Sequence, residues 1–204
     1  MGRRWRRSIL ALLVAGALTT IVAGCSSAST SSLAQDYQKT AGKGYIAGDG
    51  SILTIPAGKR KPAPQWTSKD DTGTTWSTAK LRGSVVVLNF WYASCPPCRA
   101  EAPDLRKLSA ELTPKGVVFL GVNVRDEMVT SRGFAKTYGL TYPSLLDEKE
   151  NTLQLAYAGE TPANAVPTTL ILDRQGRVAA RFSGRIMSVV TFTDIVNGVL
   201  AEKS

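Results

Sequence analysis

Two cysteines three residues apart constrain this chain most, because the sequence around them predicts a strand, a tight turn and a helix. An apolar run at 85–88 leads into Cys95-Pro96-Pro97-Cys98, and an amphipathic run follows. We expect Cys95 to lie exposed at the helix N-terminus, where the positive end of the helix dipole favours a thiolate. Cys98 lies one helical turn further on and can close a disulfide with Cys95. The pattern indicates a redox-active dithiol.

Two other interpretations of the cysteine pair remain open. A zinc site within one chain would lack ligands, because the sequence has no histidine and its third cysteine is the distant Cys25. A structural disulfide would close a very short loop, and short loops gain least from cross-linking. We therefore favour redox chemistry and expect neither a metal nor a cofactor.

The N-terminus predicts export. Four arginines between residues 3 and 7 precede about fifteen mostly apolar residues at 9–23, which is short for a membrane-spanning helix of about 20 residues. Residues 22–25 resemble the lipobox of bacterial lipoproteins. That resemblance implies cleavage before Cys25, lipidation of its sulfur and acylation of the new N-terminus, which together anchor a protein stably on a membrane. An ordinary signal peptide or an uncleaved anchor remains an alternative.

Composition divides the chain into three parts. We expect residues 1–24 to be a lipoprotein signal peptide, 25–58 a lipid anchor and flexible tether, and 59–204 a single folded domain. The tether is rich in serine, threonine and alanine at first and then in glycine, which is typical of flexible linkers. One short strand-like run interrupts it at 51–55.

Charge excludes one class of partner. The whole chain has 25 lysines and arginines against 16 aspartates and glutamates. Removal of four signal-peptide arginines leaves 21 against 16, a net charge of +5. An exported protein with this modest charge and no localised basic and aromatic patch is not expected to bind nucleic acid.

Hydrophobic periodicity predicts alternating strands and helices after a small hairpin around Trp66 and Trp76. We expect strands at 84–91, 117–124, 142–146, 168–172 and 177–183, and helices at 96–112, 128–138, 147–157 and from 188 onward. Asp147 and Glu150 are expected to open the third of these helices. This order predicts an α/β fold with a mixed central sheet covered by helices on both faces.

Several residues around the cysteines resemble the thioredoxin fold. Trp91 lies four residues before Cys95, Pro103 lies five residues after Cys98, and Val166-Pro167-Thr168 resembles the cis-proline loop. The hairpin, the segment 89–91, the αβ insertion at about 125–158 and Glu101 resemble the TlpA/ResA/CcmG group. These are membrane-tethered extracytoplasmic thioredoxin-like proteins, and the similarity covers roughly residues 60–200.

The resemblance implies roles for matching residues. Cys95 is the attacking thiolate, Cys98 resolves the mixed disulfide, and the two form the redox disulfide. Pro167 is cis and lies against that disulfide, so that a docking peptide pairs with the backbone beside it. The residues expected to bind substrate are Trp91, Pro96, Val166 and Thr168.

Two positions depart from close thioredoxin patterns. Asn89 stands where cytoplasmic thioredoxins have a buried aspartate, and an amide cannot take up a proton. Glu101 is the candidate for that role, because a partly buried carboxylate has a raised pKa. A solvated helix carboxylate remains the alternative for Glu101. Ser94 replaces a tryptophan that many relatives have before the first cysteine, which alters the expected substrate surface.

The direction of electron flow follows from the residues between and beside the cysteines. Pro96 and Pro97 remove two N–H groups that would stabilise the Cys95 thiolate, which favours a more reducing couple. Arg99 acts in the opposite direction but is expected to point to solvent. The family resemblance implies reduction of the haem-binding cysteines of apocytochrome c, with electrons from a membrane thiol transporter of the CcdA/DsbD type.

Other functions remain as alternatives. A general extracytoplasmic disulfide oxidase or isomerase would use the same dithiol, and a non-catalytic binding lipoprotein would not need it. A peroxidase of the related peroxiredoxin branch would need a Pro-x-x-x-Thr-x-x-Cys segment, which the sequence lacks. A thioredoxin-like copper chaperone would need a histidine beside the cysteine pair.

Overall fold

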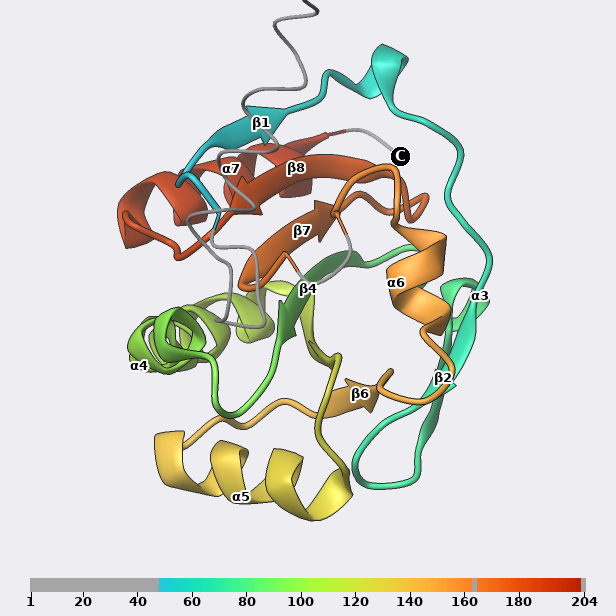
Figure 1. The fold of residues 1–204 in the computed structure, drawn as a ribbon. Helices are drawn as coiled ribbons and strands as arrows, with labels where there is room; N and C mark the ends of the chain where they lie inside the picture. Colours follow the sequence, from blue (N-terminus) through green and yellow to red (C-terminus); the bar gives the residue numbers. More distant parts are fainter. Residues whose placement is uncertain (1–47, 163–164, 203–204) are drawn as a thin grey trace, which may run out of the picture. The chain divides into compact units, whose positions relative to one another are not determined.

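The computed structural model describes residues 48–162 and 165–202 (Figure 1). The expected signal peptide, Cys25 and most of the expected tether lie outside these residues. Within the described ranges, no helix combines the length and the apolar character needed to cross a membrane.

A six-stranded mixed sheet forms the centre of the fold, as expected. Its strand order is β1-β8-β7-β4-β5-β6, with β4 parallel to β5 and antiparallel to β7. The strands are β1 (Ile52–Thr54), β4 (Val85–Trp91), β5 (Val117–Asn123), β6 (Ser144–Leu146), β7 (Thr168–Leu172) and β8 (Val178–Ser183). Every residue of β4 is buried, which explains why its sequence is a nearly continuous apolar run.

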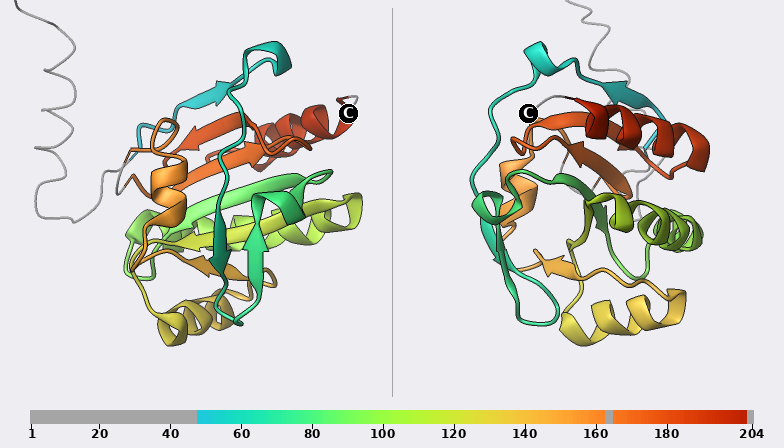
Figure 2. Two further views of the ribbon diagram at one scale, coloured as in Figure 1. Left: turned by 90° about the vertical axis from the view of Figure 1, so that its right-hand side faces the viewer. Right: turned by 180° about the vertical axis from the view of Figure 1, so that it is seen from behind.

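Helices cover both faces of the sheet (Figures 1 and 2). One side holds α4 (Pro96–Leu112), α5 (Met128–Tyr138) and α7 (Val189–Ala201), and the other holds α3 (Thr78–Leu81) and α6 (Thr152–Ala156). The described residues also form two short 3-10 helices, η1 (Ala57–Lys59) and η2 (Thr113–Lys115). In the core beneath α4 and α7, three helix leucines pack with sheet valines and with Phe192. The predicted apolar face of α4 is thereby confirmed, because Leu105, Leu108 and Leu112 are all buried.

The predicted hairpin is also confirmed. β2 (Thr67–Lys69) pairs antiparallel with β3 (Thr75–Ser77). The Asp70 carboxylate organises the connecting turn by accepting hydrogen bonds from Thr72 N, Thr74 N and Trp76 Nε1 at 2.8–2.9 Å. Trp66 anchors the other end, donating from Nε1 to the Tyr157 hydroxyl at 3.1 Å.

The folded part of the chain begins earlier than residue 59. β1 pairs antiparallel with β8, and Gly50 N donates to Ser183 O at 2.8 Å. Ile55 N also donates to Ala179 O at 2.8 Å. The expected tether is therefore wrong for residues 50–55, whereas the strand-like run predicted at 51–55 is confirmed by the pairing of β1 with β8.

One predicted helix is shorter than expected. The segment from Asp147 does not turn directly into a helix, since α6 begins at Thr152. Asp147 nevertheless acts at the helix N-terminus, where its carboxylate accepts hydrogen bonds from Leu153 N and Gln154 N at 2.9 Å each. The carboxylate thus satisfies helix N–H groups from across a turn rather than from the capping position.

Candidate active site

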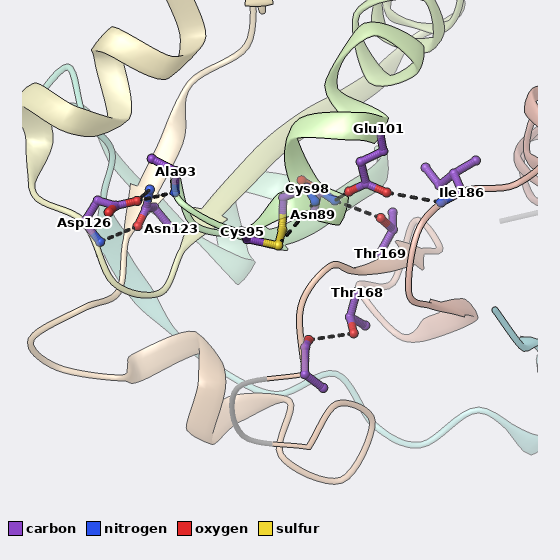
Figure 3. The surroundings of a disulfide bond; sticks show 11 residues. Asn89, Ala93, Cys95, Cys98, Glu101, Asn123, Asp126, Thr168, Thr169 and Ile186 are labelled. Atoms are coloured by element: carbon purple, nitrogen blue, oxygen red, sulfur yellow. Dashed lines mark hydrogen bonds between the residues drawn. A yellow bond between two sulfur atoms is a disulfide. The ribbon is translucent and has the colours of Figure 1, made fainter. Parts of the chain in front are cut away.

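The cysteine pair lies where β4 ends and α4 begins. Cys95 is the residue that caps α4, and its Sγ accepts a hydrogen bond from Cys98 N at 3.2 Å. Pro96 and Pro97 occupy the first helical turn, where a missing N–H costs least. Cys95 and Cys98 form a disulfide bond with their Cα atoms 5.3 Å apart (Figure 3).

The disulfide is covered in this oxidised structure. Cys95 is 0% exposed and Cys98 is 2% exposed. The expected exposure of Cys95 is therefore wrong for this state, because the residue belongs to a buried cluster with Tyr92 and Val166. Ser94 and Pro96 on either side of Cys95 are exposed. The first sulfur is therefore not accessible to solvent in this oxidised state.

Glu101 is a fully buried carboxylate one helical turn after Cys98 (Figure 3). Its oxygens accept hydrogen bonds from Asn89 Nδ2 at 2.8 Å and from Ile186 N at 3.1 Å. Burial raises the pKa of Glu101 to about 7, although these two hydrogen bonds lower it. The alternative of a solvated helix carboxylate is excluded by this position.

Asn89 joins Glu101 to the neighbouring strand. Its Nδ2 also donates to Thr169 Oγ1 at 3.0 Å, and the two residues lie opposite each other in the β4–β7 pairing. Asn89 therefore donates two hydrogen bonds through its amide, which cannot itself take up or release a proton. Thr169 and Ile186 are site residues that the sequence did not indicate, because they meet Glu101 and Asn89 only through the fold.

The loop before β7 has the expected backbone geometry. The Val166–Pro167 peptide bond is cis, and Pro167 O accepts a hydrogen bond from Gly184 N at 2.9 Å. Thr168 Oγ1 donates to Ala165 O at 2.8 Å. These bonds hold the loop between β7 and the segment that follows β8.

Most of the residues expected to bind substrate are buried. Trp91 is 3% exposed, packs on Phe134 with ring centroids 4.2 Å apart, and donates from Nε1 to Ser144 Oγ. Val166 and Thr168 are 1% and 2% exposed. In this state the side chain of Trp91 is therefore part of the core, and Pro96 is the exposed member of the expected set.

The turn before Cys95 is fixed by the end of β5. Asp126 Oδ2 accepts hydrogen bonds from Ala93 N at 2.6 Å and from Asn123 Nδ2 at 3.0 Å (Figure 3). The exposed Arg99 donates from Nε to the Tyr138 hydroxyl at 3.0 Å. Its exposure agrees with the prediction that it points to solvent, but its guanidinium also contacts the end of α5.

The described residues contain no group of three or more cysteine, aspartate, glutamate or histidine side chains arranged to hold a metal ion. The chemistry available at the site is that of the disulfide and the buried carboxylate. Exchange of the disulfide with an external thiol is the reaction that the cysteine pair supports, and Glu101 is a titratable group one helical turn away.

Comparison with known proteins points to the same chemistry. A model of the AhpC/TSA family matches residues 60–181. A protein named thiol-disulfide oxidoreductase ResA from Halalkalibacterium halodurans is 34% identical over 116 residues, which are 57% of this chain and 63% of that protein. The protein of the same name from Geobacillus thermodenitrificans is 32% identical over 122 residues, which are 60% of this chain and 67% of that protein. The match covers less than two thirds of the first relative's length.

Two solved structures share the fold over most of the described domain. A DsbF homologue from Corynebacterium diphtheriae has a TM-score of 0.65 and 32% identity, covering 74% of this chain and 94% of that one. A secreted thiol-disulfide isomerase from Corynebacterium glutamicum has a TM-score of 0.68 and 31% identity, covering 76% and 95%. The predicted fold class is confirmed.

Proposed function

This chain belongs to the AhpC/TSA family, and on that premise we propose that it exchanges disulfide bonds with other proteins through Cys95 and Cys98. The observation that carries the proposal is the fully buried Glu101 one turn beyond a cysteine pair that caps a helix. A structural disulfide would need no titratable group beside it. The ResA and Corynebacterium relatives support the same activity.

The proposed reaction starts from the reduced dithiol. The Cys95 thiolate attacks a sulfur of the partner's disulfide, which forms a mixed disulfide and releases the partner's other sulfur as a thiolate. Glu101 takes the proton from Cys98, whose thiolate then attacks Cys95 Sγ. The second partner sulfur leaves, so the partner gains two electrons and the Cys95–Cys98 disulfide is formed. A pKa of about 7 lets Glu101 take up and release that proton near neutral pH.

For the direction of exchange we propose that the chain is a reductant, acting on protein disulfides such as those of the haem-binding cysteines of apocytochrome c. Pro96 and Pro97 remove N–H donors from the first turn, and among the described residues Cys98 N donates the hydrogen bond to Cys95 Sγ. Weaker stabilisation of the thiolate favours a reducing couple. Electrons would come from a membrane thiol transporter of the CcdA/DsbD type.

We place the protein on the extracytoplasmic face of the cell membrane, held by lipid on Cys25. The support is the lipobox-like sequence at residues 22–25 and the similarity to a secreted isomerase from Corynebacterium glutamicum. Globomycin treatment of cells tests the anchor, because inhibition of the lipoprotein signal peptidase should leave a precursor of higher mass. A Cys25→Ala chain should be insensitive to the inhibitor. Equal masses with and without the inhibitor would contradict lipidation.

A second function is favoured by one specific similarity. The Corynebacterium glutamicum structure at 31% identity is described as a secreted thiol-disulfide isomerase, and a general oxidase or isomerase would use the same site. The two functions differ in reduction potential and in the state of the cysteines in the cell. A reductase should have a low potential and should accumulate oxidised in cells that lack the transporter.

A covalent trap tests the activity and names the partner. The Cys98→Ser chain should retain partners as mixed disulfides on Cys95, because the resolving thiol is absent. Mass spectrometry of the trapped species should identify proteins with cysteine pairs, apocytochrome c among them. The Cys95→Ser chain is the matched control and should trap none. Equal recovery from both variants would overturn the proposed function.

A further inference from the structure

We propose that the groove beside the disulfide binds the partner segment that flanks the reacting cysteine, and that Arg185 makes this subsite prefer an acidic side chain. The inference rests on the proposed function and adds the chemistry of the substrate. Of the Cys-Pro-Pro-Cys motif, only Pro97 lines this surface.

The groove has a volume of about 300 Å³ and adjoins the redox centre. Its walls come from the segment before β1, the first turn of α4, the cis-proline loop and the segment after β8. The lining residues are Gly48, Asp49, Gly50, Pro97, Pro167, Gly184, Arg185 and Met187. Because Pro97 lies between the two cysteines and Pro167 follows Val166, a peptide held at Cys95 extends naturally into this space.

One wall is made of backbone at close approach. Gly48 lies against Gly184, and a Cβ placed on Gly48 would come within 2.1 Å of Gly184 N. Gly184 has a φ of +91°, which favours glycine, and Gly50 N is bonded to Ser183 O. The absence of side chains at Gly48 and Gly184 lets the segment before β1 pack directly on the segment after β8, so this wall of the groove is backbone.

The opposite wall is held from beneath by the active-site carboxylate. Ile186 is 1% exposed, and its N–H donates to Glu101 Oε2 at 3.1 Å (Figure 3). Its two neighbours point outward, because Arg185 is exposed and Met187 is 77% exposed. Glu101 is therefore a positioning residue for the groove as well as the proposed proton acceptor for Cys98.

Charge gives the groove a preferred direction of binding. Arg185 is the basic lining residue, and its Nη2 lies 3.7 Å from Asp104 Oδ2, beyond hydrogen-bond length. The acidic lining residue is Asp49, whose Oδ1 already accepts a hydrogen bond from Ser51 N at 2.9 Å. A carboxylate on the partner can thus gain a guanidinium donor at Arg185, while it is repelled at Asp49.

Peptide kinetics with the full chain test this preference. The probes are synthetic peptides with one internal disulfide and with Asp, Asn or Lys at each position flanking the first cysteine. We expect a rate constant about threefold higher for Asp than for Lys at one flanking position, which is the scale of a solvent-exposed ion pair. The Arg185→Glu chain should reverse this order, and Asp49→Asn should increase the advantage of Asp.

The control and the alternative outcomes separate the two proposals. Lys107→Glu makes the same charge change on the exposed surface of α4 and should leave the peptide order unchanged. If Arg185→Glu does not fold by circular dichroism, Arg185→Gln should abolish the preference. Exchange with every peptide at one rate would overturn the acidic subsite alone. Failure to exchange with any peptide would instead overturn the proposed function.

Discussion

Two buried carboxylates at different places in this fold have opposite environments. Asp173 and Glu101 are 2% and 0% exposed. Asp173 accepts hydrogen bonds from Arg177 N at 2.9 Å, from Arg60 Nη1 at 3.0 Å and from Arg177 Nε at 2.8 Å, and these donors hold the pKa of Asp173 below its usual range despite burial. Among the described residues, the hydrogen-bond donors to Glu101 are neutral, and burial raises its pKa to about 7.

The difference separates a carboxylate that supports the fold from one that can perform chemistry. Because two guanidinium groups and backbone N–H groups lower its pKa, Asp173 stays ionised near neutral pH. With an amide and a backbone N–H, Glu101 is balanced between its two protonation states near neutral pH. The donors around a buried carboxylate, rather than burial alone, therefore decide which of the two can exchange protons near neutral pH.

The largest effect should come from breaking the compensated pair. Asp173→Ala leaves the nearly buried Arg60 without one of its partners and should lower the free energy of unfolding by about 3 kcal/mol, measured by urea denaturation. As a control, Glu111→Ala removes an exposed ion pair with Lys115 and should cost less than about 0.5 kcal/mol. Equal losses in the two variants would show that Asp173 does not stabilise the fold through its charges.

The next effect concerns the pH dependence of stability through Glu101. Its ordinary pKa of 4.5 rises to about 7 on folding, so the native state holds the proton more tightly between these values. Stability of the oxidised protein should therefore fall as pH rises from 4.5 to 7, by about 3 kcal/mol in total, and this contribution should be constant above 7. The Glu101→Gln chain should lose that slope in urea titrations at a series of pH values. An unchanged slope in this variant would show that a group other than Glu101 causes the pH dependence of stability.

A smaller effect should follow from removing the amide. Asn89→Leu deletes the 2.8 Å hydrogen bond to Glu101 and should raise the pKa of Glu101 by about 1, since one pKa unit corresponds to about 1.4 kcal/mol. The midpoint of the pH–stability curve reports this change. Thr169→Val removes the other Asn89 contact without touching Glu101 and should leave the midpoint in place. A midpoint that moves equally in both variants would contradict a direct role of the amide.

The smallest effect should come from the charges around the groove. Arg185 lowers the pKa of Glu101 and Asp104 raises it. Because both side chains are partly exposed, Arg185→Gln should raise that pKa by only about 0.3, and Asp104→Asn should lower it by a similar amount. Midpoint changes of the same sign in the two variants would show that structural rearrangement, rather than charge, dominates.

Local patterns predicted the elements that carry the site. The helix at 96–112 has the predicted limits, because the proline-containing turn starts it and its leucines repeat with helical spacing. The buried strands were predicted from apolar runs. In contrast, α3 has four residues and depends on the Ser77 side chain, which accepts Lys80 N at 3.3 Å, so it shows no periodicity.

Contacts between distant parts of the chain were not predictable. Glu101 meets Ile186, 85 residues away, and β1 pairs with β8 across the whole domain. Cys95 is buried in a cluster that also includes Tyr92 and Val166, which lie outside the Cys-Pro-Pro-Cys motif. The candidate proton acceptor was therefore predictable from spacing and from Asn89, whereas the groove and the cover over the disulfide were not.

Short strands at both margins of the sheet affect how the protein behaves in concentrated solution. β1 and β6 are the outermost strands, and each has three residues. Long unpaired edge strands promote backbone pairing between molecules and growth into fibrils, and edge strands as short as β1 and β6 make such pairing less favourable. We expect the oxidised protein to stay monodisperse on storage, and deletion of β1, which would expose the six-residue β8, to promote self-association.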